Sequence, residues 1–277
     1  GINGSGKHNN WSMATDTGIN LLSPGKTPKT NLMFLTFFVN VIKAVHDYAE
    51  LLRGSIASAG NDHRLGANEA PPAIISAFIG TQLSQLLDDL EKNIKAGKMT
   101  PQDKTELKLN IGKIPQILLD NTDRNRTSPF AFTGNKFEFR ACGSSASPGY
   151  PLSILNAAVC DVFEETNAFL EAEIASGRSV NDALSALSKK WYTHAKNIIF
   201  NGDGYSEEWR KEAEKRGLTN HRTTPEAISV LKDAAKTNFL VKTGVFKEGE
   251  IETRHNVMLE RYIKCRDIEL RTLRGMV

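Results

Sequence analysis

Polar positions recur with a helical period in the segment between Leu32 and Leu52. Alternating steps of four and three residues separate them, and they are Thr36, Asn40, Lys43, Asp47 and Glu50. Such spacing makes one narrow polar stripe on an otherwise apolar cylinder. The pattern therefore predicts a mostly buried helix from Leu32 to Leu52. Because charged residues interrupt it, the segment does not have the composition of a membrane span.

Helical patterns also cover much of the remaining chain. Apolar residues from Ile75 to Ile94 predict a helix ending near Gly97, and "TPQDKTEL" predicts a short helix capped by Thr100. Three more helices are expected from Leu152 to Ala175, from a start around Thr224 and Pro225, and from Glu250 to Arg274. The residues expected to pack the last helix are Met258, Leu259, Tyr262, Ile263 and Leu270.

The period changes to two in "SPFAFTGNKFEFRACGS". Phe137 and Phe139 alternate with Glu138 and Arg140, which predicts a β-strand with opposite characters on its two faces. Glu138 and Arg140 then leave the same face about 7 Å apart. They either share a cleft or form an ordinary cross-strand ion pair.

Two further segments lack an apolar period. Residues 1–30 are rich in Gly, Asn, Ser and Pro, which indicates loops or short strands. Residues 60–72, "GNDHRLGANEAPP", end in two prolines and predict a long loop or flap. Arg64 and Glu69 on this flap either close over a ligand or, for Glu69, stabilise the start of the following helix.

Composition narrows the function classes. The 277 residues include 35 Lys and Arg against 32 Asp and Glu, a net charge of +3 that is too balanced for a nucleic-acid or anionic-lipid surface. We therefore expect no nucleic-acid and no membrane partner. The three cysteines, Cys142, Cys160 and Cys265, have no disulfide or zinc-site spacing, which favours a reducing, cytoplasmic location.

The opening residues "GINGSGKH" come close to a Walker A loop, G-x-x-x-x-G-K-[ST]. His8, however, stands where that loop needs a hydroxyl, and an imidazole is a metal ligand. The other histidines form no metal-binding motif and are interpreted as packing or surface residues; they are His46, His63, His194, His221 and His255. Arg124 and Arg126 in "DRNRTSPF" suit phosphate or carboxylate, although two loop arginines are often only solvated.

Taken in order, "NGSGKHNNWS", "HRLGANEAPPAI", "NRTSPF" and "KFEFR" resemble the motifs of glutamine synthetase, and their wording is most similar to the type III bacterial branch. The resemblance implies an α+β fold, with an antiparallel sheet backed by helices and a mostly helical C-terminal extension. We expect residues 1–165 to form the C-terminal part of the catalytic domain and residues 166–277 the helical region. Since the chain starts inside a functional loop without Met, we expect a C-terminal fragment.

The resemblance also implies roles for individual residues. His8 and Glu138 match metal ligands, and Asn3 and Gly4 match positions that hold glutamate. Arg64 is expected on glutamate or the phosphoryl group.

Further roles follow from the same motifs. Glu69 is expected to close the ammonium site, Arg126 to assist phosphoryl transfer, and Arg140 to bind substrate and the transition state. Ser12, Arg126 and Lys136 are expected at ATP. Asn10 replaces a second histidine of the family, and Ala131 replaces a phosphate-binding arginine whose part Arg124 or Lys136 is expected to take.

The activity implied is ATP-dependent ligation of ammonia to L-glutamate through γ-glutamyl phosphate, giving glutamine, ADP and phosphate. It implies Mg²⁺ or Mn²⁺, with ATP as substrate, and a homo-oligomer of stacked rings with active sites between subunits. The fragment alone is expected to be inactive, because other metal carboxylates lie upstream in the family. A related ligase using another amine, and a non-catalytic paralogue, remain alternatives.

Overall fold

The computed structural model describes residues 6–25, 28–67, 70–95 and 127–276, and these form the predicted α+β arrangement. A four-stranded sheet has the order β1-β4-β3-β2. Its strands are β1 (Gly6–Trp11), β2 (Ala77–Phe78), β3 (Phe130–Phe132) and β4 (Phe137–Gly143). The pairs β1–β4 and β4–β3 are antiparallel as expected, whereas β2 pairs parallel to β3.

The strand predicted around Phe137 is confirmed as the β3–β4 hairpin. Its turn contains Gly134 with a φ of 96°, which a side chain would disfavour. The rings of Phe130 and Phe137 stack with centroids 4.6 Å apart, so this face of the hairpin is aromatic. Phe38 of helix α1 (Pro28–Asp47) packs on it, with its ring 5.5 Å from that of Phe137. The opposite face is therefore left for Glu138.

The long helix expected from Leu32 to Leu52 is two helices. Helix α1 ends at Asp47, and helix α2 (Ala49–Ser55) begins after Tyr48, whose φ of −111° and ψ of 20° are not helical. The predicted burial of α1 is confirmed and includes part of the polar stripe: Asn40 is fully buried and accepts a hydrogen bond from Thr166, whereas Asp47 at the helix end is exposed. In the described part of the chain, no single helix meets the length and apolarity of a membrane span, although the bent pair α1 and α2 meets them together.

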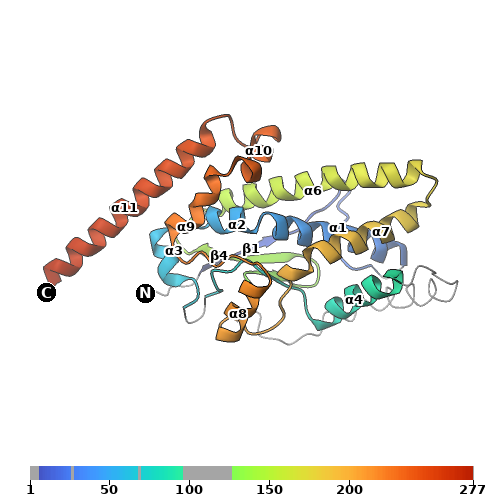
Figure 1. Ribbon diagram of the computed structural model, residues 1–277, viewed down its shortest axis with the longest axis horizontal. Coiled ribbons are helices and arrows are strands. Elements are labelled where there is room, and N and C mark those ends of the chain that lie inside the picture. Colours follow the sequence, from blue (N-terminus) through green and yellow to red (C-terminus); the bar gives the residue numbers. More distant parts are fainter. Residues whose placement is uncertain (1–5, 26–27, 68–69, 96–126, 277) are drawn as a thin grey trace.

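Helices form a layer over the aromatic face of the sheet. Helix α6 (Gly149–Ala175) confirms the helix predicted from Leu152, and helix α7 (Val180–Ala195) packs against both α1 and α6. Figure 1 shows α6 as a long rod above α1 and α7. The predicted boundary between residues 165 and 166 lies within α6, and the division of the chain into two parts stays a prediction.

Two predictions between residues 59 and 97 were wrong. The segment expected to be a loop begins with helix α3 (Ala59–Arg64), because Ser58 caps it by accepting a hydrogen bond from the Asn61 N–H. The helix expected from Ile75 is instead strand β2 followed by helix α4 (Thr81–Lys95), with Gly80 at a φ of 82° between them. Ile75 and Ile79 are buried, but not on a helix. The helix predicted at Thr100 lies outside the described residues.

The C-terminal half is helical, as predicted. Helix α9 (Thr224–Ile228) starts with a capping box between Thr223 and Glu226. The final helix α11 (Glu250–Met276) extends away from the other elements (Figure 1), and Ile263 and Leu270, expected to pack, are each 57% exposed. The elements after α7 are η3 (Lys196–Ile198), α8 (Glu207–Lys215), α9 (Thr224–Ile228), η4 (Ser229–Lys232), α10 (Ala234–Lys242) and α11 (Glu250–Met276).

Candidate functional site

A β-bulge places His8 in the sheet. On β1, Lys7 pairs with Cys142 and Asn9 with Phe139, so His8 stands opposite two residues of β4, Arg140 and Ala141. A bulge increases the local twist and re-aims the neighbouring side chains, and such irregularities concentrate near functional sites. The segment that looked like a damaged nucleotide loop is therefore partly a strand.

His8 and Glu138 lie close together across β1 and β4. His8 Nδ1 is 3.8 Å from Glu138 Oε2, and the two side chains are 46% and 15% exposed. Glu138 pairs in register with Asn10 on one side and with Ala131 on the other. An imidazole, a carboxylate and a carboxamide thus gather on two adjacent strands, while Ala131 contributes no polar group.

Arg64 reaches the same strands from helix α3. Its side chain is buried, Nη1 donates to Asn61 Oδ1 at 3.2 Å, and Nη2 donates to the Arg140 carbonyl at 3.1 Å. Asn61 also donates to the Ala141 carbonyl at 2.9 Å, so α3 is fixed to β4 at two points. Burial lowers the pKa of the Arg64 guanidinium, which nevertheless keeps its charge at neutral pH. Nε of Arg64 is buried without a hydrogen-bond partner among the described residues.

Arg140 occupies the centre of the sheet and is 1% exposed. Its Nη2 donates to Thr127 Oγ1 at 2.9 Å and to the Ser128 carbonyl, which hold it against the segment before β3. Arg64 contacts the backbone of Arg140, so the two guanidinium-bearing residues are neighbours. Together they give this part of the sheet a positive charge beside the carboxylate of Glu138.

Ser12 and Lys136 lie at the other end of the strand pair. Ser12 Oγ is 3.1 Å from the Asn135 carbonyl and 2.8 Å from Asn20 Oδ1. Asn135 precedes Lys136 in the β3–β4 turn, and Lys136 is half-buried there. The two residues expected at ATP are therefore brought to the same turn.

The candidate residues consequently follow one another along β1. At the start of β1, Gly6 contacts Arg64. In the middle, His8 and Asn10 lie beside Glu138, and just after the strand Ser12 contacts the turn that contains Lys136. Six residues of strand span about 20 Å, so these candidates are spread along one line across the sheet. The remaining candidates lie outside the described residues; they are Asn3, Gly4, Glu69, Arg124 and Arg126.

Sequence reasoning missed Asn61 and Gly6 as parts of this site. Asn61 was read as a flap residue, and its amide in fact connects Arg64 to β4. The signal in the sequence was Ser58, an N-cap residue type three positions before Asn61, which indicates a helix start at this point. Gly6 lies in the segment that comes close to a Walker A loop, and in the structure its lack of a side chain makes room for Arg64.

Known glutamine synthetases resemble this chain along its whole length. Residues 183–277 match the glutamine synthetase C-terminal domain. The chain is 53% identical over 273 residues to a glutamine synthetase of Bacteroides fragilis (strain YCH46), covering 99% of the chain and 37% of that protein. It is 42% identical over 281 residues to the type-3 glutamine synthetase of Dictyostelium discoideum, covering 100% of the chain and 37% of that protein.

A third relative is a glutamine synthetase of Butyrivibrio fibrisolvens, 43% identical over 282 residues, with 100% of the chain and 39% of that protein covered. The chain therefore spans less than two fifths of the length of these relatives. The resemblance to the type III branch, inferred from four short motifs, extends over the whole chain. The chain belongs to the glutamine synthetase family.

Proposed function

We propose that this chain contributes to an active site that joins ammonia to L-glutamate at the expense of ATP, giving glutamine, ADP and phosphate. In the proposed reaction the glutamate side-chain carboxylate attacks the terminal phosphate of ATP, and ammonia then displaces phosphate from γ-glutamyl phosphate. The observation that carries the proposal is the separation of 3.8 Å between His8 Nδ1 and Glu138 Oε2.

That separation fits a shared divalent ion. Mg²⁺ or Mn²⁺ binds oxygen and imidazole ligands at about 2.0 to 2.2 Å, so one ion reaches two atoms up to about 4.2 Å apart. In this role His8 and Glu138 would hold Mg²⁺ or Mn²⁺, with Asn10 as a neighbouring carboxamide. The ion supplies charge neutralisation for the transferred phosphoryl group.

The arginines bind and orient the substrates. Arg64 and Arg140 are buried and charged, so they offer strong partners to a carboxylate or phosphoryl oxygen that displaces part of their present contacts. Ser12 and Lys136 receive the nucleotide at the far end of β1. Asn3 and Gly4 bind glutamate, Arg126 assists phosphoryl transfer, and Glu69 closes the flap that keeps water from the acyl phosphate.

The assembly and location are part of the proposal. Because the chain spans less than two fifths of its relatives, we propose that other segments complete the metal site and that active sites form between subunits of a ring-shaped homo-oligomer. By itself the chain would then lack activity. Its three unpaired cysteines support a cytoplasmic location.

Product analysis tests the reaction. The complete protein is incubated with ATP, Mg²⁺ and glutamate, together with ¹⁵N-labelled ammonium or with a larger primary amine, and the products are identified by mass spectrometry. We expect labelled glutamine with one ADP formed per amide. Amide formed only from the larger amine would replace this proposal by the other ligase. Absence of any amide together with retained folding would support the non-catalytic paralogue.

The flap residue provides a second, separable test. Glu69→Ala should leave ATP binding intact and slow amide formation, because its proposed role follows phosphoryl transfer. A Glu69→Ala variant with unchanged turnover would remove Glu69 from the mechanism without affecting the roles of His8 and Glu138.

A further inference from the structure

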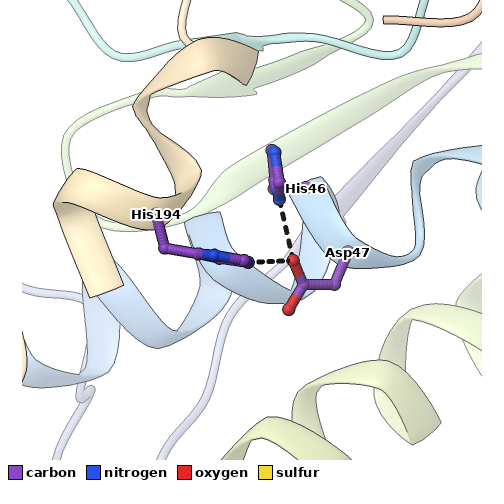
Figure 2. A group of neighbouring side chains, drawn as sticks. All are labelled: His46, Asp47 and His194. Carbon is purple, nitrogen blue, oxygen red and sulfur yellow. Dashed lines mark hydrogen bonds and ion pairs between the residues drawn. The ribbon is translucent and has the colours of Figure 1, made fainter. Parts of the chain in front are cut away.

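Two histidines that form no sequence motif meet one carboxylate where helices α1 and α7 end. Figure 2 shows His46 and Asp47 on α1 and His194 on α7, with both imidazoles directed at the same carboxylate oxygen. His46 Nδ1 is 2.7 Å and His194 Nε2 is 2.6 Å from Asp47 Oδ1. The three potential ligand atoms lie within 4.8 Å of one another.

We propose that His46 Nδ1, His194 Nε2 and Asp47 Oδ1 form a binding site for Zn²⁺ that fastens the end of α1 to the end of α7. Two imidazole nitrogens and one carboxylate oxygen are a donor set that zinc uses, with water as a fourth ligand. More generally, the site suits divalent metal ions of intermediate hardness, since imidazole also binds copper and nickel. This site uses none of the residues proposed for the ligase reaction.

The geometry requires only a small adjustment. Ligands about 2.0 to 2.1 Å from a tetrahedral zinc ion lie about 3.3 Å apart, whereas the two nitrogens are now 2.6 and 2.7 Å from the oxygen. The imidazoles therefore have to withdraw by about 0.7 Å, and each would bind zinc as the neutral tautomer, with a lone pair on the nitrogen that faces Asp47 and its proton on the other ring nitrogen. The His194 side chain is 49% exposed and the His46 side chain 23%, so both have room for such a rotation.

The surroundings favour a cation at this point. His46 and Asp47 belong to the last turn of α1, and His194 belongs to the last turn of α7. A helix C-terminus carries a partial negative charge, and here two of them meet. Helices α1 and α7 pack against each other, so the ligands come from elements whose relative position is already fixed.

A buried lysine orients the carboxylate from behind. Lys43 Nζ is 2.6 Å from Asp47 Oδ2, the oxygen that the histidines do not contact, and 2.9 Å from Glu165 Oε2. It also lies 4.7 Å from the ring centroid of Trp191. The two carboxylates of Asp47 and Glu165 carry two negative charges against the one positive charge of Lys43. With neutral imidazoles the cluster therefore has a net charge of −1. Such outer partners fix the orientation of metal ligands.

Metal analysis of matched variants tests the site. All proteins carry His8→Ala, which removes the other imidazole proposed as a metal ligand, and are dialysed against Zn²⁺. We expect one zinc per chain in this background and its loss on adding His194→Ala or His194→Gln. Gln keeps an N–H donor for Asp47 but is a poor zinc ligand, so it separates metal binding from hydrogen bonding. His63→Ala is the control, because its side chain is 48% exposed, as His194 is at 49%.

Thermal unfolding supplies the second measurement. At free zinc about 100 times its Kd, the midpoint of the His8→Ala protein should rise by about 5 °C relative to the protein with a chelator. The His194→Gln variant should show no zinc-dependent rise, and with a chelator its midpoint should match that of the parent. Retention of zinc by both His194 variants, equal loss in His63→Ala, or no zinc in the parent would overturn the proposal.

Discussion

Gly6 of strand β1 is in direct contact with Arg64 of helix α3. A Cβ atom at residue 6 would lie 1.9 Å from Arg64 Nη2 and 2.7 Å from the Cys142 carbonyl oxygen. The guanidinium thus occupies the volume that any side chain would need, and the backbone of β4 closes the other side. The position of Arg64 therefore depends on the absence of a side chain at residue 6.

Gly6→Ala should displace Arg64 and damage the proposed glutamate site. Because a clash with both a guanidinium and a backbone carbonyl cannot relax by one rotation, we expect a stability loss of about 1 to 3 kcal/mol. If Arg64 binds glutamate, KM for glutamate in the complete protein should rise by about tenfold, equivalent to about 1.4 kcal/mol. Steady-state kinetics and urea unfolding measure the two effects.

Gly143 supplies the matched control. It pairs with Gly6 in the β1–β4 register, but a Cβ atom there would lie 3.6 Å from Asn61 Oδ1, an ordinary contact. Gly143→Ala should therefore leave KM for glutamate unchanged. Equal effects of the two substitutions would mean that loss of glycine, and not displacement of Arg64, causes the damage.

His8→Ala or Glu138→Ala should weaken metal-dependent ATP binding. Each removes one of two atoms 3.8 Å apart that are proposed to hold the same ion, so we expect the Mg²⁺ or Mn²⁺ concentration for half-maximal activity to rise by about tenfold or more. Lys7→Ala is the control, since Lys7 Nζ donates to the Ala146 carbonyl at 2.7 Å and has no proposed role at the metal. Unchanged metal dependence in both variants would refute the shared site.

Local sequence pattern predicted those parts of the fold that depend on local chemistry. The alternation around Phe137, the helix start around Thr224 and the apolar character of α1 can each be read within one element, and all three are confirmed. Interruptions were harder to find. The break at Tyr48 and the strand at Ala77 depend on tertiary packing that overrides local propensity.

The candidate site was predictable to a different degree. His8 and Glu138 were found because the family motifs carry them, and the structure brings them together from positions 130 residues apart. His46 and His194 were dismissed because no spacing connects them. Their meeting depends on where α1 and α7 end side by side, which no pattern within either helix encodes.

Asp62→Ala should destabilise the connection between α3 and the C-terminal helices. The Asp62 carboxylate accepts hydrogen bonds from Thr224 N at 2.7 Å and Thr224 Oγ1 at 2.9 Å, and it lies 3.5 Å from Nη2 of Arg53. Arg53 is 1% exposed, so its charge would remain buried without its carboxylate. Removing one member of a buried ion pair costs about 3 to 5 kcal/mol, measured here by urea unfolding.

Asp16→Ala is the control for that substitution, because Asp16 lies in an exposed loop. Its free energy of unfolding should stay within about 0.5 kcal/mol of the parent. If Asp62→Ala behaved in the same way, the Arg53–Asp62 pair would contribute nothing measurable, and the contacts of Asn61 and Arg64 with β4 would suffice to hold α3.

The buried hydroxyl of Tyr150 should make the free energy of unfolding decrease as the pH rises from 10 to 12. Burial raises the pKa of the Tyr150 hydroxyl to about 12, although nearby Arg254, 4.4 Å from the ring, opposes the shift. The unfolded chain then loses this proton near pH 10 while the folded protein keeps it, so the contribution of Tyr150 to stability is complete below pH 10 and is lost on approaching pH 12. A difference of about two between the folded and unfolded pKa values corresponds to about 2 to 3 kcal/mol.

Urea unfolding at pH 9, 10, 11 and 12 measures this contribution. Tyr150→Phe should reduce the decline in the free energy of unfolding by about that amount, because phenylalanine cannot ionise. Parallel curves for Tyr150→Phe and the parent would show that other groups cause the alkaline loss.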